Sequence, residues 1–153
     1  MKDLLNLEYN QEIIIENDTF RVKSMMKFIE GSSYWLEYIL QNKENSETAY
    51  LDVEPIGKYA LHKMINLVIY PEIEVLYENN VYELFQKGNA KIETYFGYTD
   101  VGLKETVEYF EYKYKDKLLT IEKWKDCIEV SCGKYVDRKN IKIKKIEEDN
   151  YIL

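Results

Sequence analysis

The chain has 153 residues, the size of one ordinary domain and enough to bury a core without a metal or a disulfide, so we predict a single domain over residues 1–153. Its formal net charge of −7 disfavours a nucleic-acid partner, because neutralising phosphates requires a basic surface. No run of eighteen apolar residues is present, and the first residues lack the apolar core of a secretory signal. We therefore expect a cytoplasmic protein with no direct membrane insertion.

The N-terminal part predicts a helical turn or lead-in over Leu4 to Leu7 and a short strand over Glu12 to Glu16. From residue 20, apolar and polar residues alternate with a period of two, which is typical of a half-buried strand. One face of this strand is predicted to hold Phe20, Val22, Met26 and Phe28. After a turn near Gly31, the segment from Tyr34 to Leu40 is apolar on both sides apart from Glu37, which predicts a strand covered on both faces.

A polar loop then leads to a strand over Thr48 to Val53. The next segment, Tyr59 to Tyr70, fits either period, but its β-branched run and the proline that follows favour a strand. A short helix over Lys58 to Met64 is the alternative. The single histidine, His62, lies in this apolar stretch, where a packed or surface role is commoner than a catalytic or metal-binding one. We predict no catalytic residue, no metal site and no cofactor.

The second half predicts short strands over residues 74–77 and 81–85, a turn at Gly88-Asn89 and a strand over 90–98. Residues 106–133 are rich in Val, Ile, Tyr, Phe and Thr and form a predicted three-stranded meander with two tight turns. A last strand is predicted over Ile141 to Ile146, and its lysines are typical of an edge that avoids pairing with other chains.

A weak repeat relates the two halves. Glu37-Tyr38 is followed by Leu51-Asp52-Val53-Glu54, and Glu108-Tyr109 is followed by Leu119-Thr120-Ile121-Glu122. The simplest architecture is all-β and mainly antiparallel, with at most one or two short helices. It consists of two similar β-meanders, over about residues 12–56 and 81–146, packed as a sandwich or a partly open barrel, with an internal duplication as a further possibility.

The repeat also selects the candidate site residues. These are four acids and three aromatic residues that share strand faces with them or lie beside them: Glu37, Glu54, Glu108, Glu122, Trp35, Trp124 and Tyr109. Carboxylates on aromatic faces either pair with basic residues across strands or line a concave surface that binds cations. The first role is structural and the second is ligand binding.

Several short segments, taken together in their order, resemble a known family. They are Trp35 to Leu40, Tyr50 to Glu54, Gly88 to Ala90, Glu108-Tyr109, Leu119 to Trp124 and Glu129 to Gly133. This combination resembles the bacterial domain of unknown function 4178. The resemblance implies an accessory, adaptor-like role linked to envelope stress or to polyamine-related systems, and it implies no assigned activity.

Three functional hypotheses follow. The first is a non-enzymatic interaction module that binds an unknown protein partner through an exposed face or edge, since no nucleophile, metal or phosphate motif is present. The second is a receptor for a small cation such as a polyamine, which the negative charge, the fifteen tyrosines and the repeated glutamates favour. The third is a hydrolase with two carboxylates, for example Glu108 and Glu122, as acid and base.

Overall fold

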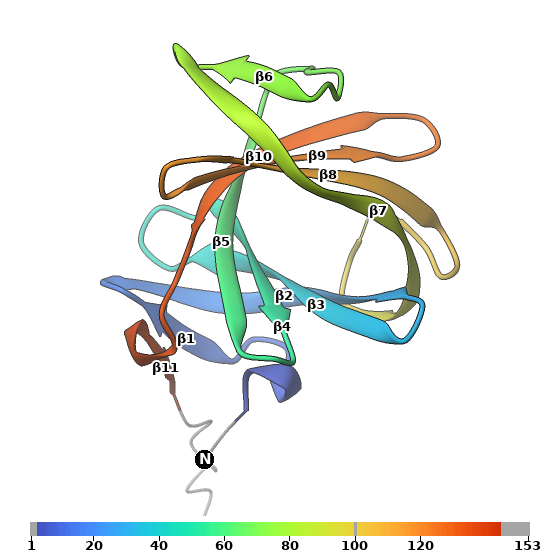
Figure 1. Ribbon diagram of the computed structural model, residues 1–153. Coiled ribbons are helices and arrows are strands. Elements are labelled where there is room, and N and C mark those ends of the chain that lie inside the picture. The colour runs from blue at the N-terminus through green and yellow to red at the C-terminus, as the bar shows by residue number, and fades with distance from the viewer. Residues whose placement is uncertain (1–2, 100, 145–153) are drawn as a thin grey trace, which may run out of the picture.

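A computed structural model describes residues 3–99 and 101–144 of the chain. Those residues form eleven strands and two single turns of 3₁₀ helix (Figure 1). The elements are η1 (Leu4–Asn6), β1 (Glu12–Ile15), β2 (Asp18–Glu30), β3 (Ser33–Asn42), β4 (Thr48–Glu54), β5 (Lys58–Ile65), β6 (Glu74–Tyr77), β7 (Asn80–Phe96), β8 (Thr106–Tyr114), β9 (Lys117–Lys123), β10 (Ile128–Tyr135), η2 (Arg138–Asn140) and β11 (Ile141–Ile143). Within this part of the chain, no helix is long and apolar enough to span a membrane.

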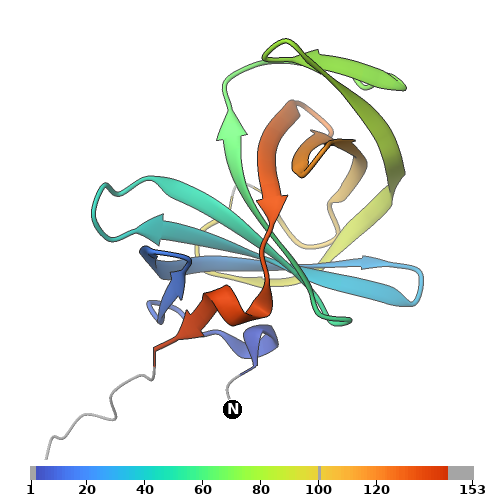
Figure 2. The ribbon, with the colours of Figure 1, turned by 60° about the vertical axis from the view of Figure 1, so that its left-hand side comes forward.

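The strands form one antiparallel sheet that closes into a barrel (Figures 1 and 2). Going round the barrel, the eight strands are β2, β3, β4, β5, β10, β9, β8 and β7, and pairing of β7 with β2 closes the ring. β1 and β11 extend the sheet beyond the ring at one end, and β6 extends it at the other. The all-β, antiparallel prediction is confirmed. The sandwich alternative is wrong, because the two four-stranded meanders join along both of their outer strands.

A bulge in β2 corrects the predicted face of this strand. The pairing of β2 with β3 shifts register between Val22 and Ser24. An extra residue in a strand reverses the faces that the following side chains occupy. Phe20 and Val22 therefore pack outside the barrel, whereas Met26 and Phe28 pack inside it. The alternation of the sequence breaks at the bulge, where Lys23-Ser24 are both polar and Met25-Met26 are both apolar.

Three other predicted boundaries differ from the structure. The segment after Thr48–Glu54 is a strand rather than a helix, but it ends at Ile65 instead of Tyr70. No turn occurs at Gly88-Asn89, because β7 runs through both residues from Asn80 to Phe96. A Cβ at Gly88 would collide with the side chains of Glu30 and Tyr109, so this glycine allows a close approach inside the barrel. β11 ends at Ile143, and the rest of the predicted last strand lies partly outside the described residues.

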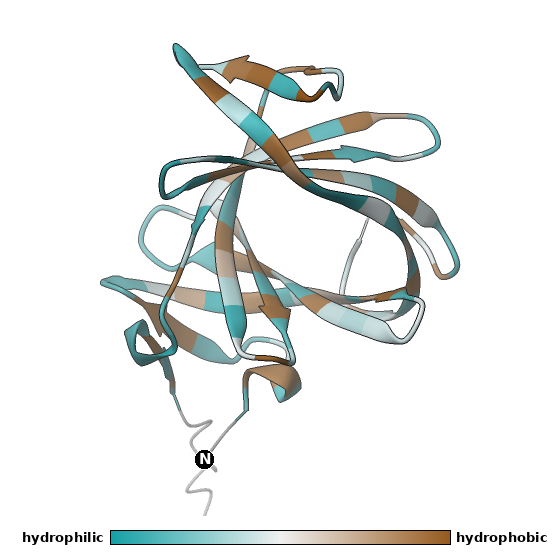
Figure 3. Ribbon diagram, in the orientation of Figure 1, coloured by the Kyte–Doolittle hydropathy of each residue, from teal (hydrophilic) through white to brown (hydrophobic). Residues whose placement is uncertain are grey.

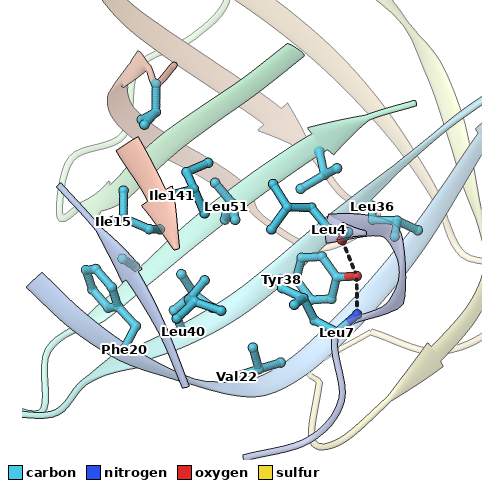
Figure 4. Packing of buried hydrophobic residues seen from close by; sticks show 14 residues of the cluster. Leu4, Leu7, Ile15, Phe20, Val22, Leu36, Tyr38, Leu40, Leu51 and Ile141 are labelled. Carbon is cyan, nitrogen blue, oxygen red and sulfur yellow. Dashed lines mark hydrogen bonds between the residues drawn. The ribbon is translucent and has the colours of Figure 1, made fainter. Parts of the chain in front are cut away.

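The largest apolar cluster lies outside the barrel wall, beneath β2, β3 and β4 (Figure 4). The outward side chains of β3 and β4 are covered by η1, β1 and β11. The Tyr38 hydroxyl donates a hydrogen bond to the Leu4 carbonyl at 2.7 Å and accepts one from the Leu7 amide at 3.3 Å. These two bonds fasten η1 to the barrel, and burial raises the pKa of Tyr38 to about 12.

Two smaller clusters complete the packing. One covers the outer face of β8, β9 and β10, where Tyr112, Leu119 and Ile121 are fully buried beneath Val75 of β6 and Tyr82 of β7. The other lies inside the barrel and fills part of its interior. Its buried members are Met26, Phe28, Ala90, Ile92, Val107 and Tyr109. The remaining interior is polar, and it holds the candidate site.

Candidate functional site

The inward faces of the barrel strands surround a cavity of about 180 Å³. Its walls carry six acidic residues against one lysine and one histidine among the described residues. The acids are Glu30, Glu37, Asp52, Glu54, Glu111 and Glu122. Acidic residues are rarely enclosed unless they are paired. This excess of negative charge therefore distinguishes the interior from an ordinary core.

Two pairs of acids are directly opposed on neighbouring strands. Glu37 of β3 is the Cα partner of Asp52 of β4, and Glu122 of β9 is the Cα partner of Glu129 of β10. Like charges placed directly opposite each other destabilise a sheet. β3 and β9 lie four strands apart in a ring of eight, so Glu37 and Glu122 lie on opposite strands, whereas Asp52 and Glu129 lie on β4 and β10, the two neighbours of β5. The fold thus brings two unfavourable pairs towards a common space.

His62 of β5 lies between these two pairs of acids. It is 5% exposed, and its Nε2 atom lies 3.1 Å from an Asp52 carboxylate oxygen. Its Nδ1 atom is buried beside Gly133. Neither this atom nor the second Asp52 carboxylate oxygen has a hydrogen-bond partner among the residues that the structure describes. Burial acts to lower the pKa of His62, but the neighbouring Asp52 outweighs it and the net shift is upward. Asp52 therefore favours the protonated form of His62.

Three carboxyl groups in the barrel, those of Glu37, Glu111 and Glu122, hold protons at unusually high pH. Burial raises the pKa of Glu37 well above its usual range, and the charges of Asp52 and Glu122 raise it further. Burial, with repulsion from Asp52 and Glu129, raises the pKa of Glu122 to about 8. Burial likewise raises the pKa of Glu111 to about 7. Near neutral pH, part of the cluster is thus protonated in the free protein.

An aromatic wall adjoins the acids. The Trp35 ring stacks on Phe28 with ring centroids 5.5 Å apart, and it meets Tyr109 edge to face at the same distance. The Tyr109 hydroxyl donates a short hydrogen bond to Glu30, whose other oxygen accepts from the Asn89 amide at 3.0 Å. The close approach at Gly88 lets these groups meet. Aromatic faces beside carboxylates are the surroundings that organic cations prefer.

One lysine lies at the other side of the cavity. Lys58 of β5 is the Cα partner of Glu54, and its ammonium group lies 4.9 Å from the centre of the Tyr135 ring. Burial acts to lower the pKa of Lys58, but Tyr135, Glu54 and Glu111 outweigh it and the net shift is upward. Lys58 therefore offsets part of the acidic lining near Glu54, whereas the Glu37 and Glu122 side of the cavity gains negative charge only as pH rises.

The structure brings together most of the residues that the sequence selected. Five of them line the cavity: Glu37, Glu54, Glu122, Trp35 and Tyr109. Trp124 follows β9, and its ring centroid lies 6.3 Å from that of Phe28. Glu108 lies on the outer side of the barrel wall, where its carboxylate oxygen is 3.6 Å from the Lys123 ammonium nitrogen. Glu108 and Glu122 therefore face opposite sides of the sheet, so the two carboxylates suggested for hydrolysis are not placed together.

Sequence reasoning missed four interior residues, which are Asp52, His62, Glu111 and Glu129. Asp52 and Glu129 could have been found as inward partners of the selected glutamates if the strand pairing had been known. His62 was considered only as a packed side chain, since nothing near it in the sequence indicates its contact with Asp52. Among the described residues, no group of three or more His, Cys, Asp or Glu is arranged to hold a metal ion.

Comparison with known proteins gives one match. A search of the curated proteins and a search of the solved structures found no match. The family model described as Domain of unknown function (DUF4178) matches residues 9–138. This match spans most of the 153 residues, and the chain therefore belongs to the domain of unknown function 4178 family.

Proposed function

We propose that the barrel is a receptor for a small organic cation, of the linear diamine or polyamine class. The observation that carries this proposal is that Glu37 and Glu122 line one cavity from opposite strands of the ring, and that each has a second acid, Asp52 or Glu129, as its Cα partner. Each pair costs stability in the free protein when both of its acids are ionised. A ligand with two ammonium groups would compensate both.

The shape and lining of the cavity support a slender ligand. Its volume of about 180 Å³ is smaller than that of pockets that hold drug-sized molecules. A methylene chain between two ammonium groups matches an aromatic wall formed by Trp35 and Tyr109, and each ammonium matches a pair of carboxylates. Binding would displace the protons that the glutamates hold, so affinity for the amine should increase as pH rises through the pKa of Glu122, which is about 8.

Such a receptor is compatible with the accessory role that membership of the family suggests. An amine bound in the barrel would stabilise the protein by mass action. The amine-bound and free forms would then differ in stability and in interior charge. A partner protein could distinguish the two forms by these differences. On this proposal the protein acts by binding, in systems where polyamines or similar amines are sensed.

Titration calorimetry with putrescine and spermidine at pH 8.5 and low salt tests the proposal. We expect saturable binding to the wild-type protein. Glu37→Gln and Glu122→Gln should each weaken the affinity by at least about tenfold, since a hydrogen bond to a charged group contributes about 1.5–3 kcal/mol.

Glu108→Gln is the matched control, because it removes the same charge from the outer side of the barrel wall. It should leave the affinity unchanged. The absence of binding heat with both amines at pH 8.5 would refute the proposal. An equal loss of affinity in the Glu108 and Glu122 variants would also refute it, because attraction by net charge would then account for binding.

A further inference from the structure

The sheet has two terminal edges, and they are protected to different degrees. β11 carries Lys142 within the strand and Lys144 directly after it, and Lys144 lies 3.2 Å from Glu12 on β1. Lysines on an edge strand prevent pairing with other chains. β6 pairs only with β7 in the described part of the sheet, and it contains no lysine. The β11 edge is thus blocked by charge, whereas the β6 edge is not.

The backbone of β6 is oriented for strand addition. The Ile73 carbonyl accepts a hydrogen bond from the Leu84 amide at 2.9 Å, just before the strand begins. In an antiparallel ladder, residues alternate between bonding to the partner strand and pointing away from it. Glu74 and Leu76 therefore turn their backbone amides and carbonyls towards the free edge. These groups can receive a further strand.

Large apolar side chains are concentrated around this edge. Half of the large hydrophobic residues that are exposed in the described chain lie between residues 67 and 85. They are Leu67, Val68, Tyr70, Ile73, Leu76, Val81 and Phe85. Leu76 and Val81 are Cα partners on β6 and β7 and share one face of the hairpin, which lies at the top of Figure 3. Exposed apolar residues grouped in this way mark interaction surfaces.

The charges of the same segment indicate the chemistry of the partner. Residues 64–86 contain four glutamates and no lysine or arginine. The glutamates are Glu72, Glu74, Glu78 and Glu83, of which Glu74 and Glu83 are Cα partners. A second copy of this chain would bring glutamates against glutamates, which disfavours a dimer through this edge. A basic segment with apolar residues complements both the charge and the exposed side chains.

We propose that the β6 edge binds an extended segment of a partner protein in which every second residue is in turn basic and apolar, because Glu74 and Leu76 share one face of the hairpin. The segment adds to the sheet as a strand next to β6. Its backbone bonds to Glu74 and Leu76, and on the exposed face of the hairpin an apolar side chain lies opposite Leu76 and a basic side chain lies opposite Glu74. This interaction does not depend on a ligand in the barrel.

A fluorescently labelled peptide that repeats Lys-Thr-Val-Thr is the probe, because it places lysine and valine on one face, and a peptide that repeats Glu-Thr-Val-Thr is the charge-reversed comparison. Fluorescence anisotropy should show binding of the first peptide and none of the second. Leu76→Lys places a lysine on the edge, as at β11, and should weaken binding by about tenfold or more. Leu76 is 67% exposed, so this variant should keep the wild-type melting temperature.

Ile56→Lys is the matched control, since Ile56 is 85% exposed and lies in the turn between β4 and β5. It adds the same charge away from β6 and should leave binding within about twofold of wild type. Hydrogen exchange should show protection of Glu74 and Leu76 amides by the peptide. The proposal is overturned if the lysine peptide does not bind, if Ile56→Lys weakens it as much as Leu76→Lys, or if wild-type protein dimerises through β6.

Discussion

The two faces of β3 show how this protein separates stability from its candidate function. The outward residues Leu36, Tyr38 and Leu40 are all buried in the largest apolar cluster. The inward residues Trp35, Glu37 and Ile39 are only partly buried, and Trp35 and Glu37 line the acidic cavity. Small barrels normally fill their interiors with packed side chains. Here a large share of the apolar packing lies outside the wall.

The elements that cover the outer face of the barrel wall make a polar interior possible. η1, β1 and β11 bury the outer face of one half of the barrel, and β6 with the start of β7 buries the outer face of the other. Because the outer packing stabilises the wall, the interior can retain opposed carboxylates that cost stability. The difference between the two faces can be tested by changing one residue at a time on each side.

The largest effect should come from the outer face. Leu51→Ala removes a fully buried side chain from the centre of the outer cluster. We expect a loss of about 2–5 kcal/mol in the free energy of unfolding, from lost burial and the cavity that remains. Urea denaturation measures it, with Ile56→Ala as an exposed control that should change stability by less than about 0.5 kcal/mol. A loss below about 1 kcal/mol would contradict the role assigned to the outer cluster.

A smaller loss should follow when η1 is detached. Tyr38→Phe keeps the ring but removes the hydroxyl that bonds to the Leu4 carbonyl and the Leu7 amide. Leaving buried backbone groups unpaired costs about 1–3 kcal/mol. Hydrogen exchange at the Leu7 amide should become faster while β8 and β9 stay protected. Unchanged exchange at Leu7 would mean that η1 is held by apolar contacts alone.

The inner face should give the protein an unusual dependence on pH. The pKa values of Glu111 and Glu122 are raised to about 7 and about 8, so the folded state binds more protons than the unfolded state above the ordinary carboxyl pKa. Stability therefore falls as pH rises from about 5 to 9. The raised pKa of His62 acts in the same direction, since the stability that its charge contributes is lost as pH rises through its folded value.

We expect the melting temperature to be lower at pH 9 than at pH 6 by at least roughly 3 °C, which corresponds to about 1 kcal/mol in a chain of this size. Glu122→Gln should reduce this difference in melting temperature, because the glutamine side chain stays neutral as pH rises. Spermidine should restore stability at pH 9 if the barrel binds it. A melting temperature that rises with pH over this range would contradict the electrostatic description of the interior.

The fold class could be predicted from the sequence because it depends on local patterns. Period-two alternation and turn residues located most strands, and the meander of β8, β9 and β10 follows directly from them. Closure of the barrel depends on long-range pairing between β2 and β7, which no local pattern encodes. The bulge after Val22 decides which part of β2 faces inward, and its local sign is a break in the alternation, with Lys23-Ser24 followed by Met25-Met26.

The site was predictable only in part, for the same reason. The repeat matched Leu51 to Glu54 with Leu119 to Glu122, and Glu54 and Glu122 do both line the cavity. The repeat also matched Glu37 with Glu108, but Glu108 lies one position away from the nearest inward-facing residue. In β8 the inward residues are Tyr109 and Glu111, so the acid equivalent by sequence faces outward. A shift of one residue in a strand reverses its faces.

The smallest effect should therefore come from the acid that the repeat placed wrongly. Glu108 is about half exposed and lies 3.6 Å from Lys123, an arrangement whose contribution is about 0–1 kcal/mol. Glu108→Gln should change the free energy of unfolding by less than about 0.5 kcal/mol at both pH 6 and pH 9, whereas Glu122→Gln should alter its pH dependence. The two substitutions remove the same charge from adjacent strands, Glu108 facing out and Glu122 facing in. Identical pH profiles for the two variants would show that the barrel wall does not divide the charges, and the functional argument built on its interior would fail with it.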